Sequence, residues 1–530
     1  MASSLRRTLV QHTSIELLPK RRTEYKGRMS INKYILAIDQ GTSSTKSLIF
    51  DEAGNAIAKG VENLHTNYFD DGFVEQDPEE IFQNVLSAVK KCLDDFATKK
   101  FDKNDIAAIG ISNQRETFVL WDKEGKPLHN AVVWQCKRSL NICEQVKQKD
   151  LSATVNQKTG LVIDPYFSAT KLIWLVQNND TVKQAVKNGE AFFGTIDTWL
   201  LYKLTNGKQY ATDYTNASRT LLFNIHTLQW DEELATAFGL TGINLPEIKS
   251  SSALFGETNC NDLLQTAIPI TAVIGDSHAA AFGEGCFEKG TAKATLGTGC
   301  SILMNIGNKP VQSNNGMVTT ICWSTEGRID YALEGVIVSC GATIEWLKNE
   351  LNLFSSSNET AAMANAVADN GGVYLIPAFS GLGSPHWDMD RKASLTGISF
   401  GTTKNHLVRA ALESIPYQIK DVIVAMEKDA GISLSALMVD GGITSNQFVI
   451  QFLADLLFKN VATIGMADVS ALGAAYLAGL KIGVYKSIEA LKELNANKNI
   501  YQPQHDTTIV NKGYEGWQKT IQKENNWKKI

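Results

Sequence analysis

The stretch that decides the fold spans Tyr34 to Phe50 and reads YILAIDQGTSSTKSLIF. Two apolar runs, Tyr34–Ile38 and Leu48–Phe50, flank a turn rich in glycine, serine and threonine, a pattern that predicts a β-hairpin. The turn region carries a carboxylate, a glycine, four hydroxyls and a cation: Asp39, Gly41, Thr42, Ser43, Ser44, Thr45 and Lys46. Hydroxyls, a cation and turn N–H groups suit phosphate oxygens, and a carboxylate suits Mg²⁺. We interpret the hairpin as a phosphate-binding element, with an ordinary polar turn as the alternative.

A second strand–turn–strand of the same kind lies far downstream, over Thr291 to Ile306, and reads TAKATLGTGCSILMNI. Glycine-bearing turns after strands recur along the chain, around Gly41, Gly297–Gly299, Gly341 and Gly441-Gly442. None of them is a GxxxxGK[ST] loop and no GxGxxG opens a helix, which argues against a P-loop and against a Rossmann dinucleotide site. Two equivalent hairpins, one in each half, fit a nucleotide held between two related α/β domains.

The length of 530 residues exceeds what one hydrophobic core supports, so at least two large domains are expected. We predict a tail over residues 1–30, an N-terminal domain over 31–284 and a C-terminal domain over 285–530. The tail is rich in Arg, Lys, Ser and Thr and lacks the apolar segment of a secretory signal. We interpret it as disordered or as the product of an overlong gene model, with a transit peptide as the alternative.

The composition argues against several function classes. Hydrophobic residues make up 44% and charged residues 20%, as in ordinary globular proteins, and a net charge of -5 does not suggest nucleic acid as a partner. No apolar run approaches the roughly 18 residues that span a bilayer. The eight cysteines form no CxxC pair and the histidines no HExxH pattern, so neither a zinc site nor a redox motif is indicated. We expect reduced core thiols in a cytoplasmic protein.

Asp276 is the sharpest catalytic candidate. It follows Gly275 and the β-branched run Ile268–Ile274, and an acid at the end of a buried strand points to a sheet edge that faces a cleft. Such a carboxylate can accept the proton of an alcohol that attacks phosphorus. No arrangement of Cys, His or Ser suggests a covalent intermediate. The alternative role of Asp276 is a helix N-cap for the Ala-rich segment that follows.

Arg115 and Glu116 stand next to each other in a strand-like region. A cation and an anion at a strand end can grip the hydroxyl groups of a polyol as donor and as acceptor, with a surface ion pair as the alternative. Trp134 and Tyr166 can supply a flat wall for the C–H face of a sugar, or they belong to the core.

On these residues the chain resembles the FGGY carbohydrate kinases, and among them most closely the glycerol kinases, from about Lys33 to Trp517. The motifs that carry the resemblance are NQRET at 113–117, VWQC at 133–136, TGLVIDPYFSATK at 159–171, YFSATKLIWLVQN at 166–178, DYTNASRTLLFNIHTL at 213–228, SGLGSPHWD at 380–388, ASLTGISFGTTKNHLVRAALE at 393–413 and SALGAAYLAGL at 470–480.

The resemblance implies an α/β fold of two actin-like (ribonuclease H-like) domains that flank a central nucleotide and substrate cleft. It implies that the enzyme phosphorylates glycerol to sn-glycerol 3-phosphate with ATP and Mg²⁺, and that residues 31–284 bind polyol and phosphates while residues 285–530 bind the nucleotide. A homo-oligomer, either a dimer or a tetramer, is expected, with no nucleic-acid partner and no transmembrane segment.

Matching positions imply individual roles. Asp276 is the implied base and Asp39 the implied metal ligand. The implied polyol contacts are Arg115, Glu116, Trp134, Tyr166, Asp276, Ser277 and Ser301. The implied phosphate and nucleotide contacts are Thr42, Ser43, Ser44, Lys46, Gly297, Thr298, Gly341, Glu345, Gly441, Gly442 and Asn446.

The chain departs from the family pattern at several positions. Ser277 stands where glycerol kinases usually have Gln, and Ser301 where they usually have Phe, so an amide and an aromatic wall are replaced by small hydroxyls. A kinase for a longer polyol or a ketose is therefore the alternative, and a non-catalytic actin-like assembly protein that binds ATP is the alternative from another class. Glu345 replaces a frequent Gln, which bears on nucleotide preference. Residues 265–267 lack the Gly-x-Arg of members that fructose 1,6-bisphosphate inhibits, so no such inhibition is expected.

Overall fold

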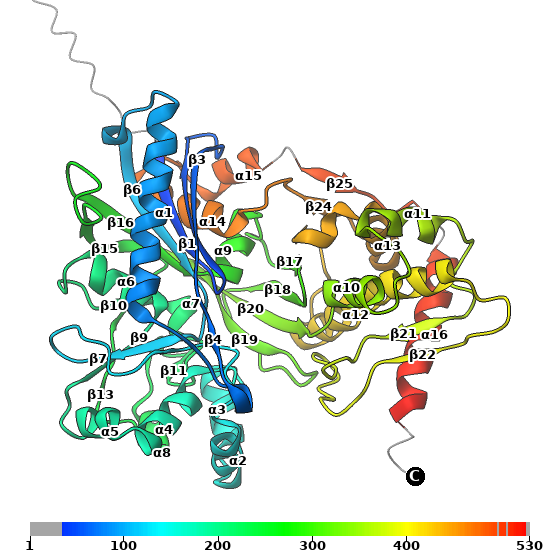
Figure 1. Ribbon diagram of the computed structural model, residues 1–530, viewed down its shortest axis with the longest axis horizontal. Coiled ribbons are helices and arrows are strands. Elements are labelled where there is room, and N and C mark those ends of the chain that lie inside the picture. The colour runs from blue at the N-terminus through cyan, green and yellow to red at the C-terminus, as the bar shows by residue number, and fades with distance from the viewer. Residues whose placement is uncertain (1–33, 496–497, 505–506, 526–530) are drawn as a thin grey trace, which may run out of the picture. The chain divides into compact units, whose positions relative to one another are not determined.

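The computed structural model describes residues 34–495, 498–504 and 507–525, and its first element is the predicted hairpin (Figure 1). Strand β1 (Tyr34–Gln40) pairs antiparallel with β2 (Ser44–Phe50), and the register places Asp39 opposite Lys46. The prediction for residues 1–30 lies outside the described residues. The hairpin prediction is confirmed.

The hairpin belongs to a six-stranded sheet. Its strands follow the spatial order β15 (Ser252–Thr258), β16 (Ile268–Gly275), β6 (Ile106–Asn113), β1, β2 and β3 (Ala56–Asn63). Strands β1, β6 and β16 run parallel, while β2 and β3 continue from β1 as an antiparallel meander and β15 closes the other edge antiparallel. The carboxyl ends of the three parallel strands therefore meet at one edge, at Asp39, Asn113 and Gly275.

A seven-stranded sheet in the second half repeats this order. Its strands are β19 (Val318–Thr325), β20 (Arg328–Ile337), β18 (Cys300–Gly307), β17 (Thr291–Leu296), β23 (Ala436–Asp440), β24 (Val461–Thr463) and β25 (Asn499–Tyr501). From β20 to β25, neighbouring strands pair in the same directions as from β3 to β15 in the first sheet. There are two antiparallel pairings, two parallel pairings and an antiparallel edge. The expected pair of related α/β units is confirmed.

The remaining strands of the described residues form further sheets. A second six-stranded sheet has the order β13 (Ile243–Asn244), β9 (Ala191–Thr195), β7 (Phe118–Trp121), β8 (Ala131–Val132), β5 (Val74–Gln76) and β4 (Asn67–Tyr68). Three two-stranded pairs join β10 (Ala211–Asp213) to β14 (Glu247–Lys249), β11 (Phe223–Asn224) to β12 (Gln229–Trp230), and β21 (Tyr374–Ile376) to β22 (Ser394–Thr396).

Helices cover both faces of the first sheet because alternate residues of β1 point to opposite sides. Leu36 and Ile38 join one core with α1 (Pro78–Thr98), whereas Ile35 and Ala37 join another with α14 (Val469–Ile482). Helix α1 is capped at its start by Asp77, whose carboxylate accepts a hydrogen bond from the Glu79 N–H at 2.8 Å.

Helix α14 comes from the second half of the chain but packs against the first sheet and against α9 (Asp276–Gly283). The contact is close: a Cβ at Gly473 would lie 1.8 Å from the Ala279 carbonyl oxygen. The small side chains of this helix therefore let two backbones touch. The division at residues 284 and 285 stays a prediction.

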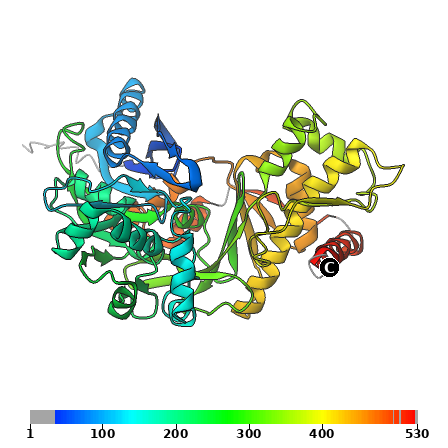
Figure 2. The same ribbon diagram turned by 60° about the horizontal axis from the view of Figure 1, so that its bottom comes forward.

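The other helices complete the layers. They are α2 (Leu140–Gln148), α3 (Ser152–Thr159), α4 (Ser168–Asn178), α5 (Asp180–Lys187), α6 (Ile196–Leu204), α7 (Tyr214–Ala217), α8 (Glu232–Phe238), α10 (Gly341–Asn349), α11 (Thr360–Asn365), α12 (Lys404–Ala430), α13 (Gln447–Leu457), α15 (Ile488–Leu494) and α16 (Thr507–Asn525). The long α12 packs against the second sheet (Figure 2).

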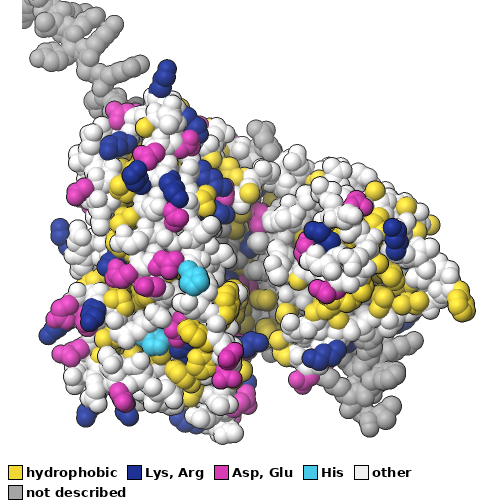
Figure 3. All heavy atoms as spheres, viewed as in Figure 1, with side chains coloured by type: hydrophobic (Ala, Val, Ile, Leu, Met, Phe, Trp, Pro, Cys, Tyr) yellow, Lys and Arg dark blue, Asp and Glu magenta, His cyan; other side chains and the backbone are white. Residues whose placement is uncertain are grey.

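All eight cysteines are free and buried. Across the part of the chain that the structure describes, no helix combines the length and apolar character needed to cross a membrane. On the face shown in Figure 3, basic and acidic side chains are interspersed.

Candidate functional site

A cavity of about 780 Å³ gathers most of the residues that the sequence singled out. The predicted residues that line it are Asp39, Thr42, Lys46, Arg115, Glu116, Trp134, Tyr166, Asp276, Ser277, Ser301, Gly441 and Gly442. They come from both large sheets and from the helices and turns at their edges, so residues more than 400 positions apart in the chain share one cavity.

Seven predicted residues do not line this cavity: Ser43, Ser44, Gly297, Thr298, Gly341, Glu345 and Asn446. Several of them nevertheless lie together beside it. The Gly341 N–H donates to the Gly297 carbonyl at 2.9 Å, and the Cys340 N–H donates to the Thr298 carbonyl at 2.8 Å. A Cβ at Gly341 would lie 2.7 Å from that Gly297 oxygen, so a larger residue there would push the two loops apart.

The other predicted residues outside the cavity have local partners. Asn446 caps α13 by accepting from the Val449 N–H at 3.3 Å. Glu345 lies on α10 and accepts a hydrogen bond from the Ser357 hydroxyl at 3.3 Å. Ser44 accepts the Gly41 N–H at 3.0 Å and thereby closes the turn of the first hairpin.

Asp276 is the first residue of α9, directly after β16, and its side chain is 39% exposed toward the cavity. The N-cap position belongs to Gly275, so the N-cap interpretation of Asp276 is wrong. Its Oδ1 accepts from the Ser277 N–H at 2.6 Å and lies 3.3 Å from the Nε of Arg115. The carboxylate is held at the cavity wall while keeping access to a ligand.

A buried polar network supports the turn that carries Asp276. The Gly275 N–H donates to the Thr215 hydroxyl at 2.9 Å, and this hydroxyl donates to the Asp213 carboxylate at 2.8 Å. The Ser251 hydroxyl donates to the same carboxylate at 2.7 Å. Asp213 and Thr215 belong to the motif at 213–228, which was the signal in the sequence for a role of these residues.

Arg115 and Glu116 belong to a buried chain of alternating charges. Glu334 lies between two guanidinium groups, 2.9 Å from Arg115 Nη2 and 2.6 Å from Arg219 Nη1, and Arg219 Nε donates to Glu116 at 2.6 Å. Burial alone raises the pKa of Glu334, but Arg115 and Arg219 outweigh it and hold that pKa well below its usual range. The surface ion pair considered for Arg115 and Glu116 is therefore wrong.

Sequence reasoning missed Glu334 and Arg219 because neither stands near the other members in the chain.

Burial raises the pKa of Glu116 despite the nearby arginines. Its backbone φ of 59° lies in the left-handed region, which costs a non-glycine residue free energy and is typical of functional sites.

Trp134 and Tyr166 form an aromatic wall. Their rings meet edge to face with centroids 5.5 Å apart. The Trp134 indole N–H donates to the Thr42 hydroxyl at 2.9 Å, so this wall is joined directly to the turn of the first hairpin. Both residues line the cavity rather than only filling the core.

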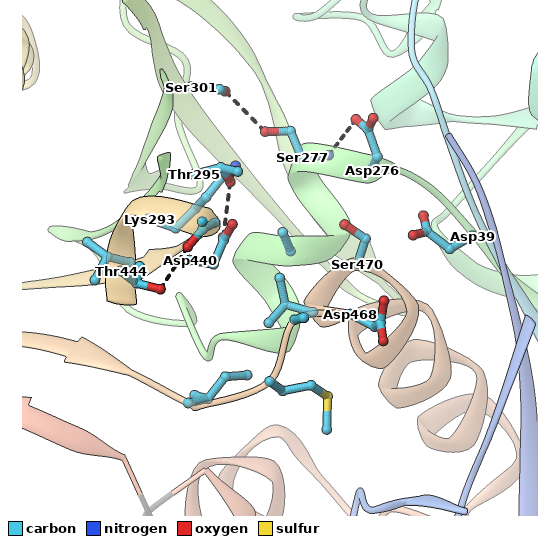
Figure 4. Close-up of a pocket in the computed structure, with 18 of the residues that line it drawn as sticks. Asp39, Asp276, Ser277, Lys293, Thr295, Ser301, Asp440, Thr444, Asp468 and Ser470 are labelled. Carbon is cyan, nitrogen blue, oxygen red and sulfur yellow. Dashed lines mark hydrogen bonds between the residues drawn. The ribbon is translucent and has the colours of Figure 1, made fainter. Parts of the chain in front are cut away.

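The hairpin end of the cavity carries opposed charges, and Figure 4 shows two of its carboxylates, those of Asp39 and Asp468. Asp39 accepts from the Ser112 hydroxyl at 3.0 Å, and burial, opposed by Lys46 and reinforced by Asp276, raises its pKa to about 6. Lys46 lies 3.0 Å from Asp468, which also lies 2.6 Å from Lys59. Asp468, just before α14, is a cavity residue that the sequence analysis missed.

Three further cavity residues that the sequence analysis missed come from the second sheet. Buried Lys293 donates to the Thr295 hydroxyl at 2.7 Å, and that hydroxyl donates to Asp440 at 3.0 Å. Asp440 precedes Gly441-Gly442, where a Cβ at Gly441 would lie 2.5 Å from the Leu296 carbonyl oxygen. The glycine turn therefore lets β23 approach the second hairpin.

Ser277 and Ser301 meet between Asp276 and the buried charges. Their hydroxyl oxygens lie 3.2 Å apart, and the Ser301 hydroxyl donates to Glu334 Oε1 at 3.4 Å. The cavity wall at this point is polar and built from small side chains (Figure 4).

The chain matches two family models. Residues 34–283 match the N-terminal domain of the FGGY family of carbohydrate kinases, and residues 292–482 match its C-terminal domain.

Curated relatives cover nearly the whole chain. A glycerol kinase of Carboxydothermus hydrogenoformans is 46% identical over 496 residues, 93% of this chain and 99% of that protein. Glycerol kinase 2 of Thermotoga maritima is 44% identical over 498 residues, 94% of this chain and 100% of that protein.

Solved structures share the fold. The crystal structure of Plasmodium falciparum glycerol kinase with ADP has a TM-score of 0.88 at 37% identity and covers 92% of this chain and 98% of its own. A xylulose kinase from Lactobacillus acidophilus has a TM-score of 0.81 at 23% identity, covering 91% of this chain and 96% of its own, a likeness that concerns the fold alone.

Proposed function

This chain belongs to the FGGY family of carbohydrate kinases, and we propose from this premise that it phosphorylates glycerol with ATP to give sn-glycerol 3-phosphate and ADP. The observation that carries the proposal is the placement of Asp276 beside buried Arg115, in a cavity that also receives the turn of the first hairpin. An acceptor base and a phosphate-binding element thus face the same space. The full-length similarity to proteins named glycerol kinase supports glycerol as acceptor.

At the acceptor end, Arg115 and Glu116 bind hydroxyl groups of the polyol as donor and acceptor. Arg115 has a buried Nη1 without a hydrogen-bond partner among the described residues, so it has donor capacity left for a ligand. Trp134 and Tyr166 contact the carbon skeleton. Since Glu334 and Arg219 hold Arg115 and Glu116 rigidly, the polyol meets groups that need little reorganisation.

At the phosphate end, the β- and γ-phosphates are surrounded by the hydroxyls and the cation of the first hairpin: Thr42, Ser43, Ser44 and Lys46. The rest of the nucleotide is surrounded by three glycine turns and two polar side chains: Gly297-Thr298, Gly341, Gly441-Gly442, Glu345 and Asn446. The support is that these turns contact one another through their backbones beside the cavity. Glycine permits such close backbone approach to a ligand.

Asp39 fits a magnesium ion. Its partly buried carboxylate has a raised pKa and lies near Asp276 and Asp468, an arrangement that favours a nearby cation in addition to Lys46. Asp39 would hold the ion directly or through water, and the ion would neutralise charge on the phosphate oxygens.

In the transfer step, an acceptor hydroxyl attacks the γ-phosphorus, its proton passes to Asp276, and the bond from that phosphorus to the bridging oxygen of ADP breaks. Positioning and charge neutralisation supply most of the acceleration of such a step. General-base help contributes on the order of 10²–10⁴-fold.

An ADP-release assay with glycerol, erythritol, xylitol, xylulose and glyceraldehyde tests the proposal. We expect glycerol to give the highest kcat/KM. Slow ATP hydrolysis that no polyol stimulates would instead identify a non-catalytic actin-like assembly protein. The same assay with added fructose 1,6-bisphosphate tests the expected lack of inhibition.

A kinase for a longer polyol or a ketose is the second candidate, and the polar contact between Ser277 and Ser301 favours it. Two small hydroxyls leave space and hydrogen-bonding capacity for an additional hydroxymethyl group. Since Ser301 lines the cavity, Ser301→Phe should lower the KM for glycerol and raise that for erythritol or xylitol. Unchanged KM values would remove Ser301 from the choice of acceptor.

We also propose a cytoplasmic homo-oligomer. The free, buried thiols support a reducing compartment. Sedimentation of the purified protein distinguishes a dimer from a tetramer.

A further inference from the structure

Lys171 is a lysine with no exposed surface, on α4, and its ammonium group makes an unusual set of contacts. The Nζ donates to the carbonyl oxygens of Pro165 and Tyr166, each at 2.7 Å, and to that of Trp134 at 3.4 Å. Within the described residues, no carboxylate lies within ion-pairing distance of this ammonium. Burying a cation without a carboxylate is costly, so three main-chain acceptors take the place of a counter-ion.

The three carbonyls belong to the two segments that carry the aromatic wall. Trp134 follows the short strand β8, and Tyr166 lies in the turn before α4, 32 positions later in the chain. Their rings touch each other, and both line the cavity. Lys171 therefore ties together two main-chain segments whose side chains have to keep one spacing at the acceptor end.

We propose that Lys171 is a positioning residue that sets the distance between Trp134 and Tyr166 and thereby the affinity for the polyol acceptor. The inference rests on the proposed function. It assigns Lys171 no contact with substrate: its effect passes through the carbonyls of the two aromatic residues. Loss of this tie affects the acceptor wall first, because no nucleotide-binding turn contacts the ammonium.

The protonation state of Lys171 gives a direct test of this positioning role, because it changes the number of hydrogen bonds that Lys171 can donate. Burial lowers the pKa of Lys171 to about 8, although Glu116, Cys136, Asp164 and Cys143 face the ammonium and raise it. A further charged group on this side of the wall is the guanidinium of Arg219, whose Cζ lies 5.9 Å from the centroid of the Tyr166 ring. Because a neutral amine has two N–H donors for three carbonyls, the tie loosens as the pH rises through about 8.

Steady-state kinetics of the full-length protein from pH 6.5 to 9.5 test the proposal. We expect the KM for glycerol to rise above about pH 8 while the KM for ATP stays constant. In Lys171→Arg, which keeps its charge throughout this range, the KM for glycerol should not depend on pH. In Lys171→Met the KM for glycerol should be high at every pH, by about tenfold, which corresponds to the loss of about one hydrogen bond to a charged group.

Lys420→Met is the matched control, because Lys420 also donates to a main-chain carbonyl, but to that of Leu456, which does not line the cavity. It should leave both KM values unchanged. A glycerol KM of the unmodified protein that stays flat to pH 9.5 would overturn the inference, even if the Lys171 variants do not fold. Equal changes in both KM values would overturn it too. Absence of glycerol-dependent turnover at any pH would instead refute the proposed function.

Discussion

The acceptor end of the cavity shows how single residues acquire a role from their neighbours. Arg115 and Asp276 are 161 positions apart in the chain, yet their side chains lie 3.3 Å apart, and Glu334 holds Arg115 from the other side. Removing one partner of such a buried set leaves an uncompensated charge, which typically costs 3–5 kcal/mol. Asp276 differs, since its carboxylate is partly exposed and its main contact is local.

Asp276→Asn should therefore fold normally but lose at least about 10²-fold in kcat, because the amide cannot accept the proton of the acceptor. Turnover by the coupled ADP assay measures this. Asp94→Asn, which changes an exposed carboxylate paired only with Lys90, is the control and should keep full activity. A variant with near-normal kcat would remove Asp276 as the base.

Asp39, the proposed metal ligand, weakens the ligand-free fold. Its pKa is raised to about 6 in the folded protein, whereas an unfolded chain has about 3.9. The ionised form is therefore disfavoured in the fold, and this penalty is fully present above about pH 6 and fades as the pH falls toward 4.

Asp39→Asn should raise the free energy of unfolding of the ligand-free protein at pH 7.5, by on the order of 1–3 kcal/mol, and should abolish transfer. At pH 5 the two proteins should differ less, because Asp39 is then mostly protonated. Denaturant unfolding at both pH values measures the difference. A variant less stable than the parent at pH 7.5 would contradict the assignment of a raised pKa.

At the scale of elements, the close crossing of α9 and α14 holds the helix that begins with Asp276, the proposed base. Sequence patterns predicted both hairpins, since a hairpin depends on neighbours in the chain. They did not indicate that α14 packs on the first sheet, because that contact joins residues more than 200 positions apart, such as Thr271 and Ala478.

Gly473→Ala should destabilise the protein by about 1–3 kcal/mol and lower kcat, because its methyl group would displace the Ala279 backbone on the helix that begins with Asp276. Thermal unfolding and turnover measure the two effects. Lys481→Ala, on the exposed side of the same helix, is the control. If Gly473→Ala proved as stable and as active as the parent, the close crossing would have no role in placing the base.

At the scale of the whole molecule, one cavity is lined from both large sheets, so acceptor and nucleotide stabilise the same folded state. Lys46 in the first hairpin and Asp468 before α14 show this connection directly. A ligand at 100 times its Kd adds about 2.7 kcal/mol to stability.

A non-hydrolysable ATP analogue with Mg²⁺ and glycerol should each raise the unfolding temperature, and together they should raise it further. Lys46→Ala should lose the nucleotide part of this shift and keep the glycerol part, because Lys46 lies at the phosphate end. Lys59→Ala is the matched control, since Lys59 pairs with the same Asp468 but does not line the cavity. Loss of both shifts in Lys46→Ala alone would argue against separate ends of the cavity.

The first hairpin, its counterpart after Thr291 and the strand that ends at Gly275 follow from the sequence alone, because turn chemistry and side-chain alternation act over a few residues. The family follows as well, since its motifs are local strings of residues. Only the tertiary structure brought Glu334, Arg219, Asp468 and Lys293 to the site and turned Lys171 from a buried lysine into a tie between two aromatic residues. The physical reason is that Coulomb and hydrogen-bond partners depend on distance in space, and spacing along the chain does not encode that distance for residues on different sheets.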